Sequence, residues 1–222
     1  MKSYRDKTGF TLVEILVVVA IIAILTLMVI TLAARFETQG KERGMKSALA
    51  LLDAALGEFR DYGFSYRHPD YNDLEFPLDC NGFSKTDLEA TLRDALGAVS
   101  VSIIGDHNDP NFSGSEALYF FLSKVPDSRK TLEKIDSSLI TSKDKNKQDM
   151  TITIDVVKEY PLFRIIDPWG RTLRYDYYDE NPPPLIPSQI KDMQDSKKVF
   201  PVITSAGQDG VFGTDDDITN RN

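Results

Sequence analysis

Apolar residues form an almost unbroken run near the start of the chain, over residues 10–34. Glu14 is the only charged residue within this run. A helix rises about 1.5 Å per residue and the hydrocarbon core of a bilayer is about 30 Å thick, so a run of this length predicts a transmembrane helix with some tilt. Lysine and arginine outnumber the single aspartate in residues 1–9, which predicts that this leader lies on the cytoplasmic side.

A different pattern follows the apolar run. Over residues 45–62 the apolar positions recur with the i, i+3, i+4 and i+7 spacing of an amphipathic helix, and no proline occurs before Pro69. We therefore expect the helix to continue over residues 35–62 with one apolar face. Gly40 and Gly44 favour a flexible hinge over close helix packing through small residues. The apolar positions of this face are Met45, Ala48, Leu49, Leu52, Ala55, Leu56, Phe59 and Tyr62.

Residues 63–150 read as an insertion of helices and loops. Its first part, to about residue 112, is rich in aspartate, asparagine, proline and aromatic residues. Helices are predicted over residues 86–96, 115–124 and 127–139, the first with a cap and an acidic first turn between Ser84 and Asp87. Residues 141–148 are polar and lysine-rich, which predicts a solvated linker.

Strand patterns begin at residue 151. Apolar and polar residues alternate over 151–157, as in a half-buried strand. Residues 162–166 and 172–178 flank the turn signal Asp167-Pro168-Trp169-Gly170 and are expected to pair as a hairpin. Four prolines make 181–187 an extended loop, and 199–204 is expected to be the last strand.

The order of these patterns predicts an α+β fold. A long N-terminal helix, transmembrane in its first half, would pack its apolar stripe on a small antiparallel sheet. The expected parts are a leader (1–9), a transmembrane helix (10–34), its amphipathic continuation (35–62), a helical and loop insertion (63–150), and a sheet with a C-terminal loop (151–222).

The net charge and the cysteine content limit the kinds of ligand and cross-link that the protein can have. The 222 residues include 26 lysines and arginines against 34 aspartates and glutamates, a net charge of −8. An acidic domain lacks the basic footprint that binds phosphate backbones, so no nucleic-acid partner is expected, whereas divalent cations are compatible. The single cysteine, Cys80, cannot form an intramolecular disulfide and is expected to be an incidental loop residue.

No group of residues has the pattern of a catalytic site. His68 and His107 are expected in surface loops, because neither has the paired spacing of a zinc site. The segment Ser113-Gly114-Ser115-Glu116 is expected to cap a helix rather than to supply a nucleophile. We therefore expect the protein not to be an enzyme. Four aromatic residues are expected in the core and on the sheet rather than on a binding platform: Trp169, Tyr175, Tyr177 and Tyr178.

Glu14 is the first candidate functional residue. A carboxylate near the membrane interior costs about 2.5–3.5 kcal/mol on insertion scales, so it requires an explanation. If the chain is cut after Gly9, Phe10 becomes a new amino terminus, and the ammonium of one subunit could pair with Glu14 of its neighbour. Alternatively, Glu14 reaches the headgroups by snorkelling. The residues alone leave both interpretations open.

The segment Lys7-Thr8-Gly9-Phe10-Thr11-Leu12-Val13-Glu14 resembles the class III signal of type IV pilins and type II secretion pseudopilins. In these proteins a membrane aspartyl peptidase, the prepilin peptidase, cuts after the glycine and N-methylates the new phenylalanine. The resemblance implies that Gly9 and Phe10 flank the cleaved bond and that Glu14 serves filament assembly.

The same resemblance implies where the protein lies and what it contacts. It implies a single-pass protein of the inner membrane with a periplasmic C-terminal domain. The implied partners are the prepilin peptidase, other copies of the chain, other pseudopilins and an inner-membrane assembly platform. Two alternatives remain: a subunit of a type IV or DNA-uptake pilus, and a membrane-tethered periplasmic domain that binds a ligand or acts as an enzyme.

A second candidate site lies in the acidic, glycine-rich residues 205–218. Composition alone favours a mobile acidic tail. However, the Asp167–Gly170 turn followed by Ser205-Ala206-Gly207-Gln208-Asp209-Gly210 resembles the major pseudopilin of type II secretion, whose terminal loop binds calcium. That family has no clear counterpart of residues 63–150. The resemblance implies a calcium site with carboxylates from Asp209, Asp216 and Asp217, carbonyls from Ala206 and Gly213, and Asp215 nearby.

Overall fold

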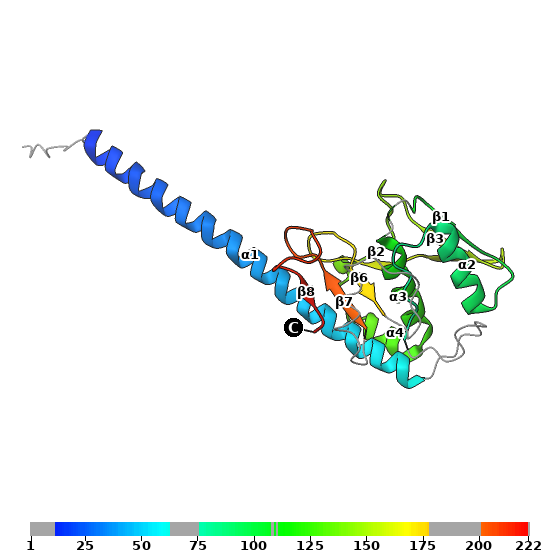
Figure 1. Ribbon diagram of the computed structural model, residues 1–222. Coiled ribbons are helices and arrows are strands. Elements are labelled where there is room, and N and C mark those ends of the chain that lie inside the picture. The colour runs from blue at the N-terminus through cyan, green and yellow to red at the C-terminus, as the bar shows by residue number, and fades with distance from the viewer. Residues whose placement is uncertain (1–11, 63–75, 108, 110, 178–200, 222) are drawn as a thin grey trace, which may run out of the picture. The chain divides into compact units, whose positions relative to one another are not determined.

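The computed structural model describes residues 12–62, 76–107, 109, 111–177 and 201–221 of the protein (Figure 1). The chain divides into two compact units, residues 1–41 and 42–222. The expected cleavage site, the proline-rich loop 181–187, His68 and Tyr178 lie outside the described residues.

Helix α1 (Leu12–Tyr62) enters both units. Its segment Leu12–Val29 has a mean hydropathy of 3.1 and is long and apolar enough to cross a membrane, and none of its residues is buried within the described part of the chain. Gly40 and Gly44 lie inside the helix, and a Cβ at either would meet no heavy atom within 4 Å. Neither glycine therefore makes a close packing contact within the described part of the chain, and their role as a hinge stays a prediction.

The second half of α1 supplies one wall of the core of residues 42–222. The predicted apolar stripe is confirmed for seven of its positions, which are all buried: Met45, Ala48, Leu49, Leu52, Ala55, Leu56 and Phe59. The eighth, Tyr62, is 58% exposed. Burying a side chain of this size contributes about 1.5–3 kcal/mol, so this face holds the helix to the domain.

Helix α2 (Lys85–Leu96) is confirmed, with Ser84 and Asp87 forming a capping box. Helix α3 (Phe112–Lys124) starts three residues before the predicted helix, so the prediction that residues 113–116 form its cap is wrong. Those residues are buried within the helix, which contacts α2 and helix α4 (Pro126–Leu132). The predicted helix 127–139 is instead α4 followed by the separate 3-10 turn η1 (Ser137–Leu139).

Three strands form the first sheet, in the order β1 (Val101–Ile104), β3 (Thr151–Ile154) and β4 (Lys158–Pro161), all antiparallel. The predicted strand 151–157 ends at Ile154. Asp155 and Val156 have positive φ angles of 53° and 61° and turn the chain into β4.

The predicted linker 141–148 is wrong. Strand β2 (Ile140–Thr141) pairs with β5 (Arg164–Ile165), and Asp144 in the following turn is buried. The carboxylate of Asp144 accepts backbone hydrogen bonds from residues 106, 146 and 148, so the turn is fixed by the rest of the domain.

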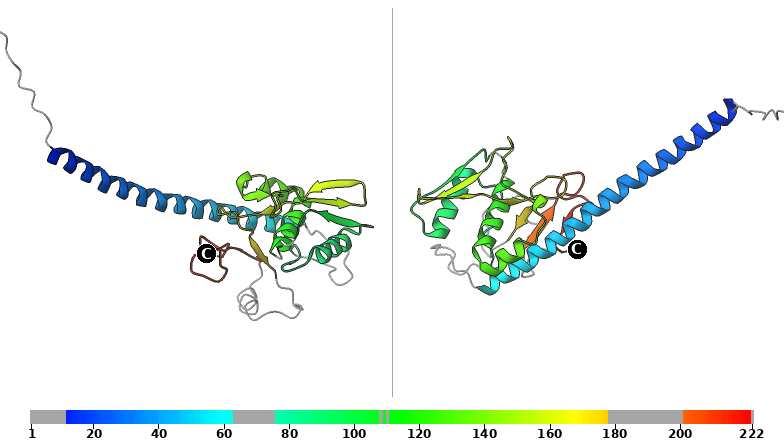
Figure 2. Two further views of the ribbon diagram at one scale, coloured as in Figure 1. Left: turned by 90° about the horizontal axis from the view of Figure 1, so that it is seen from above. Right: turned by 180° about the vertical axis from the view of Figure 1, so that it is seen from behind.

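The last sheet has the antiparallel order β6 (Arg174–Asp176), β7 (Val202–Ser205) and β8 (Ile218–Thr219) (Figure 2). The prediction that β7 is the last strand is wrong, because β8 follows it. The predicted hairpin is reduced to one bridge, Ile166↔Thr172, since β5 and β6 continue into different sheets.

The α+β fold class is confirmed. Buried residues of α1, α2, α3, α4 and β1 belong to the same core as those of β6 and β7. Residues from the insertion and from the sheet region therefore form a single hydrophobic core.

Candidate functional site

The first candidate site is the first turn of α1, where Glu14 is the acidic residue. Gly9 and Phe10 lie outside the described residues. Around Glu14 the side chains are apolar and exposed, with Leu12 at 79% and Leu16 at 62%. A helix that is apolar on all sides requires an apolar environment, which a bilayer or neighbouring helices provide.

The turn at Asp167-Pro168-Trp169-Gly170 is built around the buried carboxylate of Asp167. Its Oδ1 accepts backbone hydrogen bonds from Trp169 and Arg171, both at 2.9 Å. Its Oδ2 accepts a hydrogen bond from the Ser205 hydroxyl at 3.0 Å, which links the turn to the end of β7. The predicted turn is confirmed, and it is attached to the start of the acidic loop 205–217.

Arg171 makes a second connection between the turn and the acidic loop. Its guanidinium donates hydrogen bonds to the carbonyls of Gly207 at 2.6 Å and Gln208 at 3.0 Å. Gly210 has a φ of 76°, and a Cβ there would overlap the guanidinium of Arg171. The two sequence motifs, about 40 residues apart, are therefore one structural unit.

The acidic loop is folded by its own hydrogen bonds rather than extended as an acidic tail. The Asp209 amide donates to Asp216 Oδ2 at 2.9 Å, and the Gly213 amide donates to Asp217 Oδ2 at 2.7 Å. The Thr214 hydroxyl donates to Asp216 Oδ1 at 2.7 Å. Asp215 is exposed.

Asp217 is the residue of this loop whose side chain points most strongly to a bound ligand. Its Oδ1 is buried and has no hydrogen-bond partner among the residues that the structure describes. Burial raises the pKa of Asp217, and the charges of Asp216 and Asp209 raise it further. A divalent cation bound there would satisfy the orphaned oxygen and offset the repulsion, so the donor type fits calcium, which prefers oxygen ligands.

The other implied calcium ligands are placed as follows. The Ala206 carbonyl accepts a hydrogen bond from the Gly210 amide at 3.0 Å. The three aspartates come from one loop, but within the described residues no three His, Cys, Asp or Glu side chains converge as a metal cluster. A calcium ion here would therefore depend on Asp217 together with backbone carbonyls.

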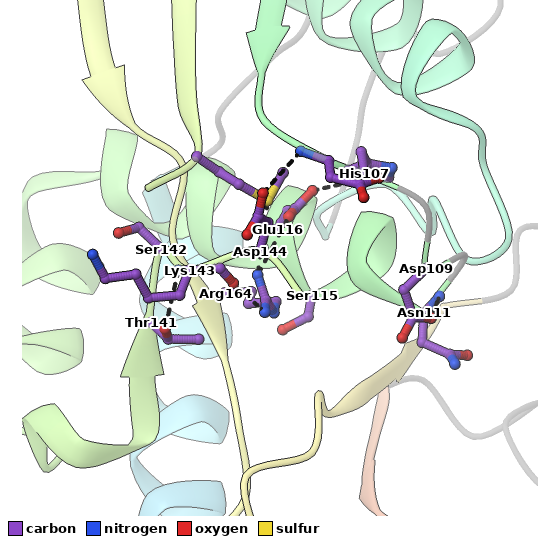
Figure 3. A network of polar contacts seen from close by, with 12 residues as sticks. His107, Asp109, Asn111, Ser115, Glu116, Thr141, Ser142, Lys143, Asp144 and Arg164 are labelled. Atoms are coloured by element: carbon purple, nitrogen blue, oxygen red, sulfur yellow. Dashed lines mark hydrogen bonds and ion pairs between the residues drawn. The ribbon is translucent and has the colours of Figure 1, made fainter. Parts of the chain in front are cut away.

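A buried charged network is the feature that the sequence did not reveal (Figure 3). His107 Nε2 lies 2.8 Å from Glu116 Oε2 on α3, and both side chains are at most 1% exposed. The prediction that His107 lies in a surface loop is therefore wrong. Burial acts to lower the pKa of His107, but the hydrogen bond and the charge of Glu116 outweigh it and raise the pKa.

Arg164 of β5 completes this network. Its Nη1 lies 4.0 Å from Glu116 Oε1, and its guanidinium lies 3.7 Å from the ring centre of Phe112. It also donates a hydrogen bond to the Lys143 carbonyl. The group forms a structural junction between α3, β5 and two loops.

Cys80 lies in a loop, as expected, but it is fully buried in the core, which the sequence did not predict. Its carbonyl accepts a hydrogen bond from the Ser113 hydroxyl at 2.6 Å. Burial raises the pKa of the Cys80 thiol, with the charge of Asp79 adding to the effect. A buried thiol with a raised pKa is unreactive. Tyr175 is buried in the core as expected.

Comparison with known proteins gave one finding. A family model described as the prokaryotic N-terminal methylation motif matches residues 4–30. No curated protein and no solved structure matches the chain. The matched motif contains Gly9, Phe10 and Glu14 and runs into the apolar part of α1. The motif and the apolar first part of α1 indicate a membrane-anchored, type IV pilin-like protein of the prepilin type. A motif of this kind implies processing by prepilin peptidase and assembly into a filament.

Proposed function

We propose that the protein is a structural, non-catalytic subunit of a periplasmic pseudopilus that serves type II protein secretion. The observation that carries this proposal is the continuity of the methylation motif with α1. The motif ends at residue 30, and the helix segment Leu12–Val29 is apolar and exposed along its whole length within the described residues. Such a surface is available to the bilayer before assembly and to neighbouring helices afterwards.

Cleavage after Gly9 would create an ammonium at Phe10, four residues before Glu14. If that ammonium paired with Glu14 of the next subunit, each charge would neutralise the other within the apolar surroundings. The secretion assignment, rather than a pilus, is supported by the Asp167–Gly170 turn, which Arg171 and Ser205 join to the acidic loop.

The experiment is mass spectrometry of the mature N-terminus followed by an assembly assay. We expect a chain that begins with N-methylated Phe10. Glu14→Ala should be cleaved normally yet fail to enter filaments, since the pairing charge is gone. Glu42→Ala, which removes an exposed glutamate of the same helix outside the motif, is the matched control and should assemble. An uncut Met1, or normal assembly of Glu14→Ala, would contradict the proposal.

Calcium is part of this proposal. In this proposal Asp217 and the carbonyls of Ala206 and Gly213 would hold the ion, and the carboxylates of Asp209 and Asp216 would close on it when it binds. The bound ion would then hold the C-terminal loop in place of a disulfide. The support is the orphaned Oδ1 of Asp217.

A ligand that binds only the folded state stabilises it by about 2.7 kcal/mol at a hundredfold excess over Kd. We therefore expect calcium to raise the Tm of the unaltered protein and a chelator to lower it again. Asp216→Ala combined with Asp217→Ala should melt at one temperature under both conditions. Asp61→Ala, an exposed site outside the loop, should keep the calcium effect. A Tm of the unaltered protein that does not respond to calcium would count against the site.

A further inference from the structure

Asn220, the residue directly after β8, joins the C-terminal segment to α1. Strand β8 is labelled beside α1 in Figure 1. Its side-chain amide donates hydrogen bonds to Asp53 Oδ1 at 2.5 Å and to the Pro201 carbonyl at 3.1 Å. Its side-chain oxygen accepts a hydrogen bond from the Ile203 amide at 2.9 Å. One side chain therefore ties together α1, the start of β7 and the end of β8.

Asp53 lies at the edge of the buried face of α1, next to the buried Leu52. Burial raises the pKa of Asp53, whereas the hydrogen bond from Asn220 and the charge of Arg221 lower it. A partly buried carboxylate is unfavourable unless it is hydrogen-bonded, so Asp53 depends on the C-terminal segment being in place.

Strand β8 connects this contact to the acidic loop. Asp217 immediately precedes β8 and Asn220 immediately follows it. The strand itself pairs with β7 through only two residue pairs, Thr204↔Thr219 and Ser205↔Ile218. A strand this short has little stability of its own, so its position is set by what holds its two ends.

We infer that Asn220 and Asp53 form a latch that couples calcium occupancy of the acidic loop to the assembly helix α1. The inference rests on the proposed calcium site at Asp217. Ordering the loop fixes the first end of β8, which lowers the entropy cost of placing Asn220 against Asp53. Coupling between two sites is reciprocal, so the latch must strengthen calcium binding by the same factor by which calcium strengthens the latch.

The test uses the full mature chain in detergent micelles. Isothermal titration with calcium chloride gives the Kd, and hydrogen exchange of residues 49–57 reports on α1 with and without calcium. In the unaltered protein calcium should slow exchange across 49–57. Asn220→Ala should lose that slowing and bind calcium about fivefold more weakly, at the lower end of typical coupling.

Two variants of Asp53 separate the latch from general damage. Asp53→Asn keeps an oxygen that accepts the Asn220 hydrogen bond and should retain the calcium effect on exchange. Asp53→Leu should lose it and should weaken calcium binding by the same factor as Asn220→Ala, and combining the two should add nothing further.

The outcomes distinguish the inference from the function on which it rests. Calcium binding by Asn220→Ala with unchanged Kd, and with exchange across 49–57 still slowed, would overturn the latch and leave the calcium site standing. Failure of the unaltered protein to bind calcium would overturn both. If Asp53→Asn lost the effect as fully as Asp53→Leu, the hydrogen bond would not be the coupling contact.

Discussion

Asp79 shows how strongly one residue can depend on its surroundings. Its carboxylate accepts backbone hydrogen bonds from Asn81 at 2.9 Å and Tyr177 at 3.3 Å. Burial raises the pKa of Asp79 to about 7, and the charge of the nearby Asp176 adds to the rise. The contact holds the chain around residue 80 to the end of β6.

The raised pKa gives this carboxyl a defined effect on stability. The folded state binds the proton more tightly than the unfolded state, whose pKa is 3.8. The contribution of Asp79 to the free energy of unfolding is therefore fully present below about pH 4, where the carboxyl is protonated in both states. It is lost as the pH rises to about 7. The free energy of unfolding of the unaltered protein should fall, relative to that of Asp79→Asn, by up to about 1.4 kcal/mol per pH unit across this window. Urea unfolding at several pH values measures the difference, and a difference that does not change with pH would contradict the assignment.

Single residues were predictable where the signal is local. Ser84 and Asp87 form the expected cap because both partners lie within one turn. The burial of His107 and Cys80 was missed because their partners, Glu116 and Ser113, are brought close only by the tertiary fold. No pattern around either residue indicates that it is buried.

Among the elements, α1 and α2 were predicted well and the strands less well. The spacing of apolar residues is enough to define a long amphipathic helix. By contrast, β8 is two residues long and lies directly behind the acidic loop, so it has no alternating pattern of its own. The start of α3 was missed because its serines suggest a cap, although Ser115 in fact hydrogen-bonds Ile165 in β5.

Arg164 joins β5 to α3 through Glu116, beside the hydrogen bonds between Ser115 and Ile165. Removing one partner of a buried ion pair costs about 3–5 kcal/mol, because the other charge stays buried. Arg164→Met should lower the free energy of unfolding by about this amount, and adding Glu116→Gln should restore much of it. Urea unfolding followed by circular dichroism measures the effect.

The matched control for Arg164 is Lys130→Met, which breaks an ion pair with Asp127 that is about 70% exposed on both sides. Its stability should not change measurably, because solvent screens exposed pairs. If Arg164→Met and Lys130→Met changed the free energy of unfolding equally, the network around Arg164 would contribute no more to stability than an exposed ion pair.

At the scale of the whole molecule, α1 contributes both the exposed apolar segment Leu12–Val29 and part of the core of residues 42–222. The buried stripe from Met45 to Phe59 completes the core of residues 42–222. The C-terminal candidate site likewise forms only when distant parts of the chain fold together. The N-terminal motif is contiguous in sequence, whereas the link from Arg171 to Gly207 could not be predicted from two motifs so far apart.

This arrangement predicts how the chain can be shortened. A fragment of residues 42–222 keeps the stripe and should be a folded, soluble monomer. A fragment of residues 63–222 loses seven buried side chains of α1 and should aggregate or remain unfolded, since the apolar surface they covered is exposed. Size-exclusion chromatography and circular dichroism compare the two, and a folded 63–222 fragment would contradict a core that requires α1.

The burial of Cys80 has a practical consequence for mapping the filament. The chain has one cysteine, and that thiol is enclosed by the core with a raised pKa. The native protein therefore offers a background that is silent to maleimides and other thiol reagents. Single cysteines introduced at exposed positions of α1, such as Glu37 or Glu42, can be labelled or cross-linked selectively without first replacing Cys80.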